Sequence, residues 1–176
     1  EPIPRQADPP AVDLTELPQT EERRASYDDP LARLARIDVA YHIPESLTAD
    51  HDALSVLATI LSSGRSSRLY QAIVRDTQLG VNVGAFAVSN RGPSLFRLVG
   101  IAAPGADIGA LETAIYNQIE RIKVEPVEDW ELAKARNGAR RSFVASLGSS
   151  LQRAIILSRY ALFYDNPSLI NSRAER

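Results

Sequence analysis

Residues 61–81, LSSGRSSRLYQAIVRDTQLGV, decide how the first half of the chain folds. Apolar positions recur at helical spacing up to Leu61, and Gly64 follows as a glycine of the kind that ends helices. A second helix is predicted from about Ser66 to near Gly80, and its inward positions are Leu69, Ile73 and Val74. The stretch therefore predicts two consecutive helices that meet at Gly64.

Alternating apolar and polar residues on both sides of these helices predict an antiparallel sheet. From Leu31 to Ile43 the odd positions are mostly apolar and Pro44 ends the pattern, which predicts a half-buried strand. Val81–Ser89 and Leu95–Ala103 predict two more strands, joined by the turn-forming tetrapeptide Asn90-Arg91-Gly92-Pro93. Small residues in these strands predict the close approach of another backbone or helix; they are Gly84, Ala85, Ala87 and Gly100.

The C-terminal half predicts three helices. The first begins near Asp107, and its apolar stripe consists of Ile108, Leu111, Ile115, Ile119 and Ile122. The second follows Pro126, with acidic residues in its first turn and basic residues later, which complements a helix dipole. The third runs from Ser149 to Tyr164. The order strand, two helices, hairpin and three helices predicts an α+β fold, with an antiparallel sheet covered on one face by helices.

The proline distribution predicts the domain organisation. Six of the eleven prolines lie within the first thirty residues, among charged residues, and such a composition buries too little apolar surface to order itself. We expect residues 1–25 to be an extended linker, with one added strand considered near Arg23–Tyr27. Residues 26–176 are expected to form a single α+β domain that is truncated at its C-terminus.

The composition limits the classes of function. The chain has no cysteine, which excludes disulfides, thiolate zinc sites and a cysteine nucleophile. Its net charge of −2, with acids and bases interspersed, gives no field that selects nucleic acid or an anionic membrane. No apolar run approaches the roughly 18 residues that a membrane span needs. The compartment stays open, and a periplasmic or other extracytoplasmic location is compatible with the sequence.

Familiar catalytic patterns are missing. The two histidines, His42 and His51, lack the His-x-x-Glu-His spacing, so no zinc site is expected. No serine stands in a Gly-x-Ser-x-Gly elbow, although a triad that assembles in space stays open. Tandem carboxylates could supply an acid and a base, but solvation and helix-dipole pairing explain them better; they are Glu21-Glu22, Asp28-Asp29 and Glu128-Asp129.

The segment Gly64-Arg65-Ser66-Ser67-Arg68 has two interpretations. It could bind an anion through free amides at a helix N-terminus, two hydroxyls and two guanidinium groups, as in an independent anion-binding enzyme. It could instead be a connector, in which a glycine stop precedes a serine cap and both arginines are solvated. The connector is favoured because the segment lacks the Lys-Ser/Thr ending and the preceding strand of a phosphate loop.

The order of these motifs resembles the non-zinc, second-type (C-terminal-like) domain of the pitrilysin and insulinase family of zinc metallopeptidases, which includes mitochondrial processing peptidase. The matching pieces are Tyr41 to Pro44, Leu61 to Gly64, Ser66 to Leu69, Val74-Arg75 and Leu79-Gly80. The later stretch PVEDWELAKARNGARRSFVASL resembles the long helix of the family. The resemblance covers roughly residues 24–165.

The resemblance implies paired α+β domains that close around an unfolded peptide. A zinc-bearing domain, in cis or in a partner subunit, would supply the zinc and His-x-x-Glu-His, whose Glu is the general base for attack by zinc-activated water. This chain would form chamber wall and interdomain surface, hold no cofactor, and be inactive by itself. Alternatives are a catalytically inactive scaffold or assembly subunit of the same family; a homodimer is also considered.

The resemblance further implies that Arg75 is a substrate-binding residue. Arg75 falls on the Arg of a Leu-Arg…Leu-Gly-Tyr arrangement that holds substrate and stabilises the tetrahedral intermediate, whereas Val81 falls on the Tyr. Valine cannot donate a hydrogen bond, and losing such a donor typically costs about 100-fold or more in rate. Arg75 is therefore also compatible with a remnant held by Asp76 or by a neighbouring helix. No catalytic or metal-ligating residue is expected in this chain.

Overall fold

A computed structural model describes residue 10 and residues 12–172 of the chain. Its sheet has three antiparallel strands in the order β1-β3-β2, so β3 is paired on both sides. The strands are β1 (Arg36–Ile43), β2 (Gly80–Ala87) and β3 (Ser94–Ala102). The predicted hairpin is confirmed, because β2 pairs directly with β3.

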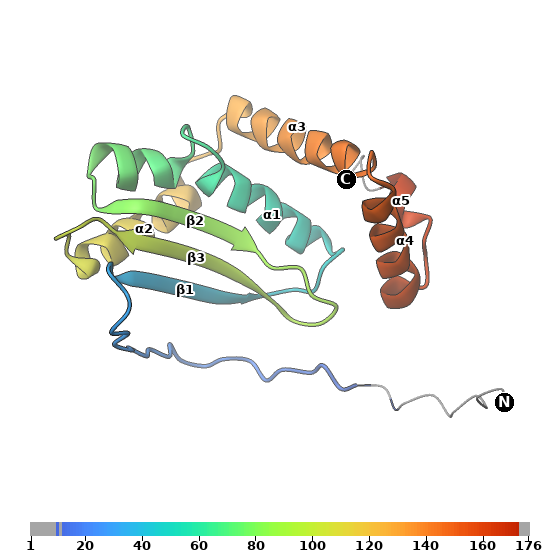
Figure 1. Ribbon diagram of the computed structural model, residues 1–176, viewed down its shortest axis with the longest axis horizontal. Helices are drawn as coiled ribbons and strands as arrows, with labels where there is room; N and C mark the ends of the chain where they lie inside the picture. Colours follow the sequence, from blue (N-terminus) through green and yellow to red (C-terminus); the bar gives the residue numbers. More distant parts are fainter. Residues whose placement is uncertain (1–9, 11, 173–176) are drawn as a thin grey trace.

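Helices cover one face of this sheet, as Figure 1 shows. The covering helices are α1 (Ala49–Ser62), the π-helix η1 (Tyr70–Asp76) and α2 (Ile108–Val124). Further helices follow within the described residues, namely α3 (Asp129–Ser146), α4 (Ser150–Tyr164) and α5 (Leu169–Ser172). The predicted α+β class and the one-sided covering of the sheet are confirmed.

Short polar side chains begin the helices where the sequence places them. The hydroxyl of Thr48 accepts a hydrogen bond from the backbone N–H of His51, at 3.3 Å, in the first turn of α1. Asp107 accepts two backbone bonds at the start of α2, and Ser149 accepts one at the start of α4. Beyond α1, Gly64 has a φ of +75°, which a glycine adopts without steric cost.

The core lies between the helices and the covered sheet face. Its most deeply buried apolar side chains are Leu61, Leu69, Ile73, Leu98, Leu111 and Ile115. The close approach predicted at Gly100 is confirmed, because a Cβ there would lie 3.1 Å from Cδ1 of Ile115 and 3.2 Å from Cγ2 of Ile37. At Gly84 the close neighbour is instead the ring of Phe86, two residues along the same strand.

Several element boundaries differ from the prediction, and two of the differences have a clear cause. The second helix ends at Asp76 rather than near Gly80, since Gln78 has a left-handed φ of +54° and Gly80 already begins β2. The first strand begins at Arg36 rather than Leu31, because pairing with β3 reaches only from Arg36 to Ile43.

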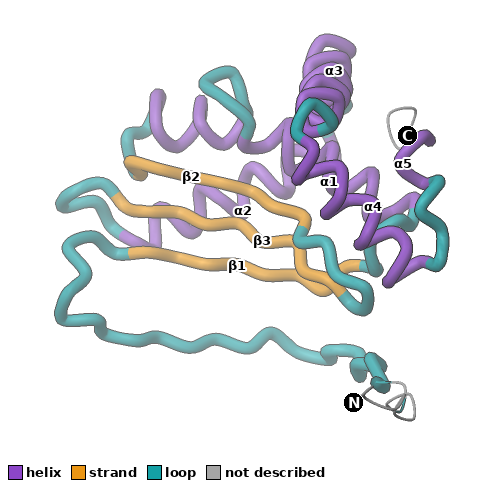
Figure 2. Tube along the Cα trace, turned by 45° about the vertical axis from the view of Figure 1, so that its right-hand side comes forward, coloured by secondary structure: helices purple, strands orange, loops and turns teal. Residues whose placement is uncertain are grey.

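The N-terminal segment runs extended beside β1, in both views of the backbone (Figures 1 and 2). The strand considered near Arg23–Tyr27 is wrong, because these described residues form no strand. Side chains hold the segment instead: Nη2 of Arg24 lies 2.6 Å from Oε1 of Glu112. Of the linker expected over residues 1–25, residues 1–9 and 11 lie outside the described residues.

The last helices stand away from the sheet. α3 packs on α1, and α4 lies beyond it near one end of the strands (Figure 1). Tyr164, at the end of α4, shares a hydrogen bond of 2.6 Å with the hydroxyl of Ser46 in the β1–α1 loop. Among the described helices, none combines the length and apolar character that crossing a bilayer requires.

Candidate functional site

Arg75 lies in the last turn of η1, on the surface. Its side chain is 60% exposed, and its Nε donates a hydrogen bond of 2.7 Å to Oδ1 of Asp76. This bond raises the pKa of the Arg75 guanidinium, which therefore stays charged. The expected contact with Asp76 is confirmed, and within the described part of the chain it engages Nε alone.

Val81 lies at an irregularity of the sheet. Gly80 pairs with Ala102 and Asn82 pairs with Ile101, so Val81 is the extra residue of a β-bulge. Its side chain is half-exposed and carries no donor. Bulges of this kind redirect a side chain and are frequent next to active sites.

Gly80 brings η1 and β2 together between these two residues. A Cβ on Gly80 would lie 3.0 Å from Cγ2 of Ile73 in η1 and 3.1 Å from the backbone oxygen of Ile101. Only glycine fits such an approach without a shift of the neighbouring backbone. Arg75 and Val81 therefore sit on a π-helix and a bulge that meet at Gly80, and both irregularities are typical of functional sites.

The turn at Gly64 is joined to α3 by hydrogen bonds, and none of its side chains caps η1. The hydroxyl of Ser67 donates 2.7 Å back to the carbonyl of Gly64, so the predicted serine cap is wrong. The hydroxyl of Ser66 accepts from Nζ of Lys134, at 2.8 Å, and the same ammonium group donates to the carbonyl of Ser63. The turn therefore joins α1 and η1 and also receives a side chain of α3.

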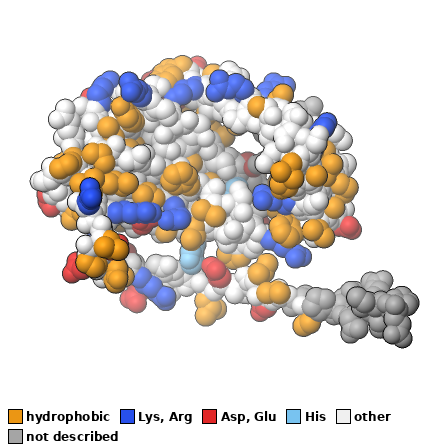
Figure 3. Space-filling view, in the orientation of Figure 1, with side chains coloured by type: hydrophobic (Ala, Val, Ile, Leu, Met, Phe, Trp, Pro, Cys, Tyr) orange, Lys and Arg blue, Asp and Glu red, His pale blue; other side chains and the backbone are white. Residues whose placement is uncertain are grey.

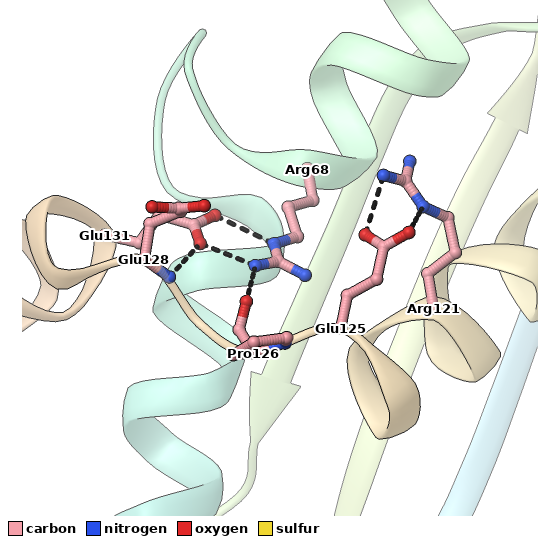
Figure 4. Close-up of polar contacts among 6 residues, drawn as sticks. All are labelled: Arg68, Arg121, Glu125, Pro126, Glu128 and Glu131. Atoms are coloured by element: carbon pink, nitrogen blue, oxygen red, sulfur yellow. Dashed lines mark hydrogen bonds and ion pairs between the residues drawn. The ribbon is translucent and has the colours of Figure 1, made fainter.

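Arg68, at the end of this turn, is paired inside the protein (Figure 4). Its Nε and Nη2 donate to the two carboxylate oxygens of Glu131, at 2.8 and 2.6 Å, and Nη2 also donates to the carbonyl of Pro126. The Arg68 and Glu131 side chains are only 14% and 7% exposed. The expectation of a solvated Arg68 is wrong, because α3 folds over the turn and supplies Glu131.

The ion pair with Arg68 also favours the charged form of the Glu131 carboxylate. The bond from Arg68 lowers the pKa of the Glu131 carboxyl, burial opposes this, and the backbone N–H of Glu128 supports it. Glu128 and Glu131 form a capping box at the start of α3, which agrees with the helix-terminus interpretation of Glu128. With both groups charged and bound to each other, the turn favours the connector interpretation over an anion site.

A groove opens beside this ion pair. It has a volume of about 490 Å³ and lies between η1, the end of α2 and the start of α3. Arg121 and Glu125 form an exposed ion pair on its rim, with Nη2 of Arg121 2.8 Å from Oε2 of Glu125 (Figure 4). Gln118 also lines the groove, and sequence reasoning missed it. The available signal was a glutamine in the apolar stripe of α2, three residues after Ile115.

The histidines lie apart and serve different contacts. His51 is buried in α1, with its Nε2 3.1 Å from the carbonyl of Val88, whereas Nε2 of the exposed His42 is 3.9 Å from Glu16. Throughout residues 12–172, no three His, Cys, Asp or Glu side chains are grouped in a way that could hold a metal ion. These residues do not fit a zinc site.

Comparison with known proteins identifies the family. The sequence model of the family described as the peptidase M16 inactive domain matches residues 2–139. The zinc protease PqqE of Helicobacter pylori is 24% identical over 129 residues, which are 73% of this chain but only 29% of PqqE. The chain therefore spans less than a third of that relative.

Solved structures show the same fold. A protease from H. pylori superposes with a TM-score of 0.71 at 24% identity, covering 78% of this chain and 33% of that one. The inactive peptidase domain of a proposed zinc protease from Bordetella parapertussis gives a TM-score of 0.66 at 23% identity, covering 77% of this chain and 75% of that one. The family match and the shared fold confirm the resemblance drawn from the sequence, and the chain belongs to the family of peptidase M16 inactive domains.

Proposed function

We propose that this chain is the non-zinc domain of a zinc metallopeptidase, where it forms part of the wall around the peptide and meets the zinc-bearing domain. The observation that carries the proposal is the uncovered face of the sheet. Figure 3 looks onto this face, where basic and apolar side chains gather over the strands. A sheet face left open beside a covered one is available to line a chamber.

The open face offers contacts that suit a peptide. Arg36 and Arg97 both bind Asp38, with Nε of Arg36 2.6 Å and Nη2 of Arg97 2.7 Å from its carboxylate oxygens. Two cations share one anion, so this cluster keeps a positive charge that attracts carbonyl oxygens and acidic side chains. Phe86 lies exposed on the neighbouring strand β2 and adds an apolar contact.

Arg75 is proposed to contact the substrate at the end of this sheet. Because Asp76 engages Nε alone, the two terminal nitrogens of Arg75 are suited to donate to a peptide carbonyl. The zinc chemistry would be supplied by another domain, and this chain would hold and orient the peptide.

The alternative is a scaffold that only assembles with its partner. The observations that favour it are Val81, which cannot donate to an oxyanion, and the charge of Asp76 beside Arg75. In that case the open face would serve assembly rather than peptide binding.

The test begins with the parent gene and its neighbours, which are read for His-x-x-Glu-His. The domain that carries this motif is co-purified with the chain, and hydrolysis of an unfolded peptide is measured with and without a zinc chelator. We expect hydrolysis to require both partners and to fall at least about tenfold in Arg75→Ala. Arg65→Ala, which alters an exposed arginine of the Gly64 turn, is the matched control.

Two results would decide against the proposal. Full hydrolysis by the zinc-bearing domain without this chain would remove any role in the chamber. An assembly in which neither the parent protein nor its co-purified partner has the zinc motif would establish the scaffold instead.

A further inference from the structure

One of the residues that line the groove beside Arg68 is a buried glutamine, Gln118. Gln118 is 7% exposed, and its Oε1 is buried without a hydrogen-bond partner among the described residues. The position belongs to the stripe of α2 that buries Leu111 and Ile115, where an apolar side chain would pack at no such cost. Buried polar atoms without partners are rare in native proteins, and each calls for an explanation such as a bound group.

A second unpaired atom belongs to another residue that lines the groove. Nε and Nη2 of Arg68 are bound to Glu131 and Pro126, but Nη1 is buried and has no partner in the described part of the chain. Two residues that line the groove thus hold buried atoms without a partner among the described residues, an acceptor on Gln118 and a donor on Arg68. The amide of Gln118 also carries a donor, Nε2. A ligand that satisfies them must itself carry acceptors and a donor.

The geometry points to an extended peptide as that ligand, and we propose that this groove is a peptide-binding subsite. A residue in extended conformation presents its N–H and C=O to the same side, as in the bonded pairs of an antiparallel ladder. The amide of Gln118 matches these two groups, and Nη1 of Arg68 donates to a second carbonyl. The volume of about 490 Å³ is in the range of ligand sites.

The charges around the groove select a basic peptide. The lining includes four carboxylates and two guanidinium groups, an excess of two negative charges; the charged residues are Arg68, Asp76, Arg121, Glu125, Glu128 and Glu131. Lysine or arginine side chains on either side of the bound residue complement this excess.

The subsite is continuous with the proposed substrate contact. Asp76 lines the groove and also binds Arg75, so a peptide held at Arg75 can continue along η1 to Gln118. This inference rests on the proposed function. It adds a second contact with the same peptide substrate, away from the open sheet face.

Trp130 reports on the groove directly. It is the only tryptophan of the chain, lines the groove and is 53% exposed, so its emission responds to occupancy. The probe is a disordered 16-residue peptide of Lys, Ser, Gly and Ala, and the comparison peptide has Glu in place of Lys. We expect a saturable change in Trp130 emission with the basic peptide and weaker binding of the acidic one.

The decisive variant is Gln118→Leu. It should weaken binding of the basic peptide at least about tenfold, because two hydrogen bonds are lost. It should also raise the melting temperature by about 3 °C, because an unpaired amide leaves the interior. Gln152→Leu, the same substitution on the exposed surface of α4, should leave the affinity unchanged.

Three results would overturn the subsite. They are no saturable binding by the unaltered chain, an unchanged affinity in Gln118→Leu, and an equal loss in Gln152→Leu. An unchanged affinity with a lowered melting temperature would assign the amide to an ordered water instead. Arg75→Ala separates the two proposals: if only this variant loses peptide, the proposed function stands and the subsite fails, whereas loss only in Gln118→Leu supports the subsite without Arg75.

Discussion

Arg68 and Glu131 lie 63 positions apart in the sequence and form a two-pronged ion pair, with distances of 2.8 and 2.6 Å. The pair joins the turn after α1 to the first turn of α3, and both side chains are nearly buried. Glu131 also accepts from the backbone N–H of Glu128, so one carboxylate binds the turn before η1 and caps α3 at the same time. The position of α3 over the turn therefore depends on this contact.

Breaking the pair from one side should destabilise the fold. Arg68→Met leaves a buried carboxylate without its cation, and we expect a loss of about 3 kcal/mol in the free energy of unfolding, measured in urea. The double variant Arg68→Met with Glu131→Leu should recover part of this loss, because neither charge is then left unpaired. Additive losses in the double variant would contradict a direct interaction.

The pair should make stability depend on acid pH. The folded-state pKa of Glu131 lies below its ordinary value of 4.5, so its contribution is complete above that value and is lost as the pH falls through the lower, folded-state pKa. Melting temperatures between about pH 7 and pH 3 should therefore fall less steeply in Glu131→Gln than in the unaltered chain. Glu21→Gln, in the exposed N-terminal segment, is the control, and an equal change there would refute the assignment.

Two glycines should respond to alanine in opposite directions. At Gly100 a Cβ would press on side chains of α2 and β1, so Gly100→Ala should cost about 1–3 kcal/mol of unfolding free energy. At Gly138, in the interior of α3, nothing lies within 4 Å, and Gly138→Ala should add about 0.5–1 kcal/mol. Urea unfolding measures both, and a stable Gly100→Ala variant would disprove the close packing of α2 on the sheet.

Restoring a phenol at the bulge should raise activity if the chain works in a peptidase. Val81 is half-exposed, so Val81→Tyr fits without strain in the core. With the zinc-bearing domain present, we expect kcat to rise by up to about 100-fold, with little change in KM. Val81→Phe has the same ring without the hydroxyl, and an equal rise there would attribute the gain to packing alone.

Helix starts were predictable because they depend on neighbours in the sequence. Thr48, Asp107 and Ser149 each accept a bond from a backbone N–H two or three residues later, and no distant residue is needed. The hairpin followed from two alternating runs and a short turn between them, which are equally local signals.

The incorrect predictions concern features that depend on contacts with distant segments of the chain. The second helix ended early because Gly80 must enter β2 against Ile73 and Ile101. The first strand began late because its paired register with β3 begins at Arg36, and among the described residues only one further backbone bond, from Ala102 to Ala35, precedes it. Arg68 was predicted to be solvated because its partner, Glu131, lies 63 positions away and no local sequence signal indicates the pairing. Gln118 gave a signal, a polar residue in an apolar stripe, but its meaning required the groove around it.

The sequence by itself determined the order and type of the elements, the one-sided apolar patterning that produces an α+β fold, and the motif series that indicates the family. These properties depend on backbone preferences and on periodic burial, which act over a few residues. Only the tertiary structure decided the partner of Arg68, the place of Val81 in a bulge and the burial of Oε1 of Gln118 without a partner in the described part of the chain. The reason is physical: desolvation and pairing of a polar group depend on what packs around it, and those neighbours come from distant parts of the chain.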